Sequence, residues 1–83
     1  MPVVAQFDGI KIEFYFDDHP PPHFHARCAE HIAVIEIKSL RVMNGGLPPR
    51  QLRQVIDWAA GKADDLLRAW YQCRLKQHPG DIQ

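Results

Sequence analysis

The fold is decided by a seven-residue stretch, Ile10-Lys11-Ile12-Glu13-Phe14-Tyr15-Phe16, in which apolar and polar side chains alternate. Because successive side chains of a strand point to opposite faces, this alternation predicts a strand with one buried face. We expect its isoleucines and phenylalanines to face the core, and Lys11, Glu13 and Tyr15 to face outward. Asp8–Gly9 precedes the stretch and predicts a two-residue hairpin turn, because both residue types tolerate positive φ. An earlier strand then contains Val3, Ala5 and Phe7.

Three further strands are predicted after this stretch. His23–Cys28 resumes the alternation, Ile32–Ile37 is a β-branched run typical of a central strand, and Leu40–Met43 fits a short last strand. In the strand predicted over His23–Cys28, one face carries Phe24, Ala26 and Cys28, and the other carries His23, His25 and Arg27.

The period of the apolar residues changes after a loop at Asn44–Gly46. Spacings of three and four residues predict helices near Pro49–Ala60 and Lys62–Gln77. The sequence therefore predicts an α+β fold, with a small, mostly antiparallel sheet of four to five strands followed by two C-terminal helices packed on one face. We expect residues 1–83 to form a single domain, with a β-rich half (1–43) and a helical half (47–78).

Composition narrows the class of protein. The 83 residues are 46% hydrophobic and 24% charged, an ordinary globular balance, and ten acidic residues offset ten basic ones, so no overall field attracts nucleic acid or a membrane. No apolar run approaches the ~18 residues of a membrane span, and no signal peptide is recognisable. We expect a cytoplasmic protein whose two cysteines, Cys28 and Cys73, are free and buried. Association into a homodimer or with a partner protein is an open question, because a domain of this size is only marginally stable alone.

The segment that could carry chemistry is Asp17-Asp18-His19-Pro20-Pro21-Pro22-His23-Phe24-His25. If His23 and His25 belong to a strand, their side chains emerge on one face, ~6–7 Å apart. One interpretation is a metal site, in which zinc or nickel binds through His19, His23 and His25, or through the pair and an aspartate.

A second interpretation is metal-free acid–base catalysis by His23 and His25, with Arg27 stabilising an anion and Asp18 orienting an imidazole. A third is anion or nucleic-acid binding, with Tyr15 as a further surface contact. The fourth is structural, with the imidazoles and aspartates bonded within the loop. If His23 and His25 face outward with Arg27, as alternation along the strand predicts, replacing both with alanine should change stability by less than ~0.5 kcal/mol.

The motif also resembles a small bacterial family known as domain of unknown function 4160. The similarity rests on Phe14–His19 and Pro21–Ala26, and on the later Leu47-Pro48, Leu52…Val55…Trp58 and Leu66-Leu67…Trp70. The matching motif positions are Asp18, His19, Pro21, Pro22, His23, Phe24 and His25. The resemblance implies a small partner protein from a neighbouring gene, in an arrangement similar to toxin–antitoxin pairs, and it makes a role directed at nucleic acid a reasonable expectation.

Two hypotheses follow, and whether the protein is an enzyme stays open between them. The first is one component of a toxin–antitoxin-like pair that acts on or binds nucleic acid through the histidine–proline motif. The alternative is a non-catalytic binding or regulatory module, with or without a metal ion.

Overall fold

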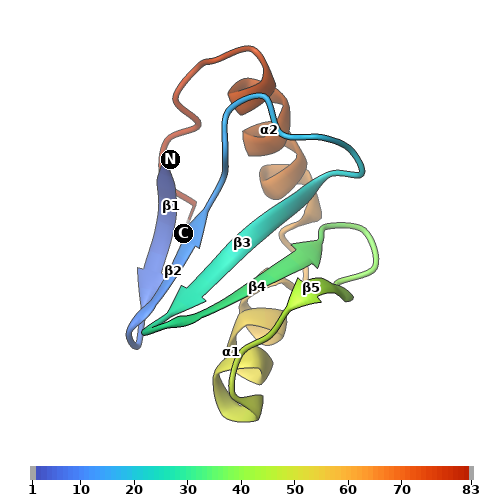
Figure 1. Cartoon of the computed structure of the whole chain (residues 1–83). Helices are drawn as coiled ribbons and strands as arrows, with labels where there is room; N and C mark the ends of the chain where they lie inside the picture. The colour runs from blue at the N-terminus through green and yellow to red at the C-terminus, as the bar shows by residue number, and fades with distance from the viewer. Residues whose placement is uncertain (1, 83) are drawn as a thin grey trace.

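The computed structural model describes residues 2–82 and contains one five-stranded sheet and two helices. The elements are β1 (Val3–Phe7), β2 (Ile10–Glu13), β3 (His23–Cys28), β4 (His31–Glu36), β5 (Val42–Gly45), α1 (Pro49–Ala59) and α2 (Ala63–Arg74). The strands follow chain order across the sheet and every neighbouring pair is antiparallel. Both helices lie on the same side of the sheet (Figure 1). The predicted α+β architecture is confirmed.

The first hairpin forms where the sequence predicted it. Asp8 and Gly9 have φ values of 48° and 75°, and Phe7 pairs with Ile10 across the turn. Positive φ at both turn residues matches the twist of the two strands that they join. This hairpin sets which β2 residues face the helices.

The core lies between the sheet and the helices. The side chains of Ile12, Phe24 and Ile35 are fully buried on the sheet's helix-facing side, and Val55 and Leu66 meet them from α1 and α2. Burying a side chain of this size contributes about 1.5–3 kcal/mol. Neither described helix, of 11 and 12 residues, is long and apolar enough to cross a membrane.

The strand predicted over Ile10–Phe16 is shorter in the structure. It ends at Glu13. The amide of Phe14 still donates to the carbonyl of Pro2 (3.1 Å), but the chain then leaves the sheet and turns at Asp17, where φ is +57°. Phe16 therefore lies in the loop with 44% of its surface exposed, and the expectation that it faces the core was wrong. The expectation that Glu13 faces solvent was also wrong, because Glu13 is only 5% exposed beneath Arg27.

The last strand is displaced by two residues from the predicted Leu40–Met43. Leu40 has a φ of +58° and belongs to the preceding turn, whereas Asn44 and Gly45 are strand residues rather than loop residues. Gly45 has a φ of +66°, and a Cβ atom there would lie 2.1 Å from the carbonyl oxygen of Ile32. Only glycine therefore lets β5 approach β4 at this point.

The two cysteines differ in their surroundings. Cys73 of α2 is buried, and burial raises the pKa of its thiol, so it is a structural thiol as predicted. Cys28 is partly exposed at the end of β3, which corrects the expectation that both are buried. The reason is position, because Cys28 is the last residue before the turn to β4.

Candidate metal centre

The loop between β2 and β3 carries Asp18 to the start of β3, and the end of α2 fixes that loop. Arg74 donates from Nη1 to the carbonyl oxygen of Asp18 at 2.6 Å, and Lys76 forms an ion pair with Asp17 at 3.3 Å. Asp18 also accepts the backbone N–H of His19 through Oδ1 at 3.0 Å. Its second carboxylate oxygen, Oδ2, is left to face β3.

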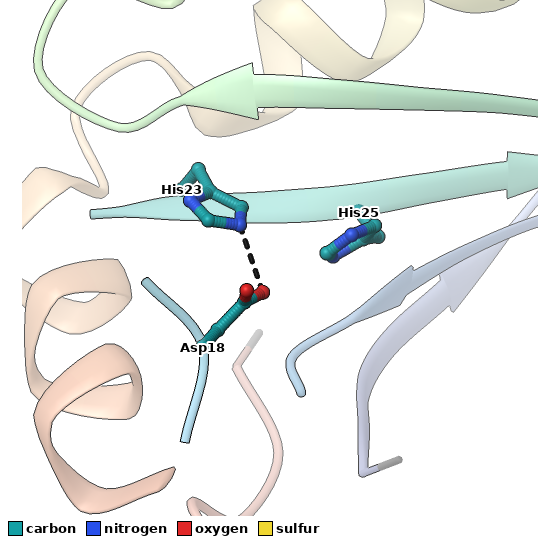
Figure 2. Close-up of side chains that lie close together, drawn as sticks. All are labelled: Asp18, His23 and His25. Atoms are coloured by element: carbon teal, nitrogen blue, oxygen red, sulfur yellow. Dashed lines mark hydrogen bonds and ion pairs between the residues drawn. The ribbon is translucent and has the colours of Figure 1, made fainter. Parts of the chain in front are cut away.

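Three side chains of the motif converge at this place. One potential ligand atom from each of Asp18, His23 and His25 lies within 4.8 Å of the others. Figure 2 shows both imidazoles on β3, with the carboxylate approaching them from the loop. The shortest link joins Nε2 of His23 to Oδ2 of Asp18, at 2.8 Å.

The ring of His23 is held in one orientation by its other nitrogen. Nδ1 lies 2.7 Å from the carbonyl oxygen of Pro21, which can only accept a hydrogen bond, so Nδ1 carries a proton. Nε2 then faces the carboxylate of Asp18 with one proton between the two atoms. A metal-binding histidine commonly donates its non-ligating N–H to a backbone carbonyl in this way. The arrangement suits replacement of the intervening proton by a cation.

His23 is more enclosed than its place on the polar face of β3 suggested. It is 7% exposed, and its ring packs against Trp70 of α2, with the ring centres 4.9 Å apart. The expectation that it faces outward was wrong, because β3 begins beside α2 and the helix covers its first residue. Its hydrogen bonds and its contact with Trp70 give it a structural role as well.

His25 has a different environment. It is partly buried, lies opposite Glu13 in the sheet register, and stacks on Tyr15 with ring centres 3.9 Å apart and planes 8° apart. Burial lowers the pKa of His25 from its ordinary value of 6.5, and the neighbouring His23 lowers it further, against the opposing effects of Asp18 and Glu13. The imidazole is therefore neutral near pH 7, which is the form that binds a metal ion or accepts a proton.

Arg27 lies on the same face of β3 but outside the cluster. Its Nε donates to Oε1 of Glu13 at 3.0 Å, and its side chain is 36% exposed. The hydrogen bond to Glu13 raises the pKa of Arg27, which keeps its positive charge. It supplies a fixed cation next to His25.

The predicted site residues are thus only partly brought together. His19 is exposed and stands outside the cluster, where the carboxylate of Asp18 takes the third position beside His23 and His25. Sequence reasoning missed Trp70, the Pro21 carbonyl and Glu13. Pairing β2 with β3 from their alternation could have placed Glu13 opposite His25, but no sequence signal pointed from the motif to Trp70.

A hollow of about 530 Å³ lies along β1, between Phe7, Trp58 and Ile82, and it includes none of the three cluster residues. Asp18 is 22% exposed at its side chain, so a ligand could approach the cluster from the surface.

Comparison with known proteins identifies the same family as the histidine–proline motif did. No curated protein and no solved structure matches the chain significantly. A family model described as "Domain of unknown function (DUF4160)" matches residues 9–71, a span that includes the loop, the cluster, Arg27 and Trp70. Since this span is well over half of the chain, the protein belongs to the DUF4160 family.

Proposed function

We propose that this domain is a metal-dependent binding or regulatory module, in which Asp18, His23 and His25 hold one divalent transition-metal ion. The observation that supports it is the convergence of three ligand atoms within 4.8 Å. The Pro21 carbonyl adds to this, because it directs Nε2 of His23 toward the other two ligands.

The donor set favours particular ions. Two imidazoles and one carboxylate suit zinc or nickel, whereas calcium and magnesium prefer oxygen ligands alone. Three protein ligands leave a coordination position for water or for a group from another molecule, as in catalytic rather than closed structural zinc sites. The partly exposed carboxylate of Asp18 marks the side on which such a module would bind a group presented from outside.

Calorimetry with Zn²⁺ and Ni²⁺ on the untagged protein tests this function. We expect uptake near one ion per chain, weakening on acidification because imidazole ligands must be neutral. His25→Ala should abolish the high-affinity uptake. His19→Ala is the matched control, because it removes an exposed imidazole of the same loop and should leave uptake unchanged. Absence of uptake, or equal loss in both variants, would contradict the proposal.

A second candidate function is supported by the neutral state of His25. An imidazole that is neutral near pH 7, beside the hydrogen-bonded His23–Asp18 pair and the charge of Arg27, is a set suited to metal-free phosphodiester cleavage. His25 would remove the proton of the attacking hydroxyl, His23 would return one to the leaving oxygen, and Arg27 would stabilise the charge between them. This is the toxin–antitoxin-like function, exerted in the bacterial cytoplasm and restrained by a partner protein from a neighbouring gene.

Expression of the protein alone tests the second candidate. Growth should stop, co-expression of the neighbouring-gene protein should restore it, and His25→Ala should be harmless. The purified protein should cleave RNA in the presence of a chelator. Normal growth on expression of the original protein, or cleavage that needs added metal, would remove this candidate and leave the first.

A further inference from the structure

We propose that the metal site binds a phosphate oxyanion on its open side, with one phosphate oxygen on the metal ion and another on the guanidinium of Arg27. The inference rests on the proposed metal site and names the class of ligand that the site takes.

The first step is the placement of Arg27 relative to the cluster. His23, His25 and Arg27 follow one another on the same face of β3, and such neighbours are ~6–7 Å apart along a strand. Arg27 is therefore the next polar side chain beyond His25 on this face, on the side from which an anion on the ion would meet its guanidinium. Both helices lie on the opposite side of the sheet (Figure 1), and the side chain of Arg27 is 36% exposed on this face.

The second step is the state of the guanidinium. Its Nε–H is used by Glu13, which is itself buried, and this hydrogen bond fixes the plane of the group. A guanidinium has five N–H donors, so even with Glu13 and the side chain of Tyr15 as partners, N–H groups of the terminal nitrogens remain for another acceptor. Their fork matches two oxygens of a phosphate.

The third step is the local charge. A divalent ion, Arg27 and Lys11, which pairs with Arg27 across β2 and β3, together carry four positive charges. They outweigh the three carboxylates of Asp18, Glu13 and Glu36, the last of which pairs with His23. The loaded site is therefore positive although the chain as a whole is neutral. Attraction of an anion is confined to this face.

Free phosphate and the phosphodiester of a nucleic acid present the same oxyanion, and the test separates them. The protein is loaded with Co²⁺, whose visible absorption reports a bound ion and responds when a new ligand joins it. Inorganic phosphate is titrated in one arm and a single-stranded oligothymidylate in the other. We expect a spectral change that saturates in at least one arm, and the arm identifies the source of the oxyanion.

Three variants test whether Arg27 is the second contact of the bound anion, besides the metal ion. Each variant is first loaded with Co²⁺. Arg27→Gln should then weaken anion affinity about tenfold or more relative to the original protein, since it removes a charge-assisted bidentate contact. Arg27→Lys retains a charge for Glu13 and should fall between Arg27→Gln and the original. Arg53→Gln is the matched control, because it makes the same substitution at an exposed arginine of α1 on the other side of the sheet. It should change affinity less than about threefold, since a distant exposed charge is screened.

The outcomes separate the two proposals. If no cobalt spectrum appears, the metal site itself fails and the phosphate inference falls with it. If cobalt binds but neither anion changes the spectrum, or if Arg27→Gln and Arg27→Lys bind as tightly as the original, only the phosphate inference is overturned. Thermal unfolding of each variant confirms that a loss of anion affinity is not a loss of fold.

Discussion

The two faces of β3 are built from six consecutive residues, yet they are held by different means. On one face Phe24 and Ala26 are fully buried, and their contacts come from neighbouring strands and from the helices above. On the other face His23, His25 and Arg27 each depend on a polar or aromatic partner, from a loop or from β2. An apolar side chain is stabilised if it points to the face that the helices cover. Each polar side chain on the other face needs one particular partner in the right place. The predictions below test that difference.

The largest effect is expected on the apolar face. Phe24→Ala should destabilise the fold by about 3–5 kcal/mol, because a fully buried aromatic ring is replaced by a cavity. Phe16→Ala makes the same substitution at a ring that is 44% exposed, and it should cost much less. Urea unfolding of both variants gives the comparison. Equal losses would mean that burial does not distinguish these two rings.

A smaller effect is expected at the buried end of the polar face. His23→Ala should destabilise the metal-free protein by about 1–3 kcal/mol, because it leaves the acceptors of Asp18 and Pro21 unpaired. His19→Ala serves as the control and should stay within ~0.5 kcal/mol of the original. If chemical denaturation gives the two variants the same stability, the hydrogen bonds of His23 add nothing to the fold.

The smallest effect is a pH dependence from His25 in the metal-free protein. Its pKa is lowered in the folded state by burial, so the unfolded chain takes up a proton more readily. The contribution of His25 to stability is therefore complete above its ordinary pKa of 6.5 and declines as the pH falls through the folded-state value. NMR titration of the ring should show the lowered pKa, and His25→Gln should flatten the acid limb of the stability curve. A ring that titrates above 6.5 would reverse the sign.

The sequence predicted β3 with its correct ends because alternation and the flanking turns agree there. The helices were placed within three residues at each end by their apolar spacing. The end of β2 was missed, because alternation continues to Phe16 while the backbone leaves the sheet after Glu13. The aspartate in the cluster could not be chosen over His19, because that choice depends on how α2 holds the loop.

The chain-order arrangement of the sheet has a kinetic consequence. Each strand pairs with the next one along the chain, so the sheet can assemble from successive hairpins with small loop-closure entropy, which favours rapid folding. The link between Arg74 and Asp18 instead joins residues 56 positions apart. We expect this contact to form after the hairpins, so that the cluster reaches its final geometry only when α2 has docked. Ion uptake during refolding would then report the last stage of assembly rather than the first.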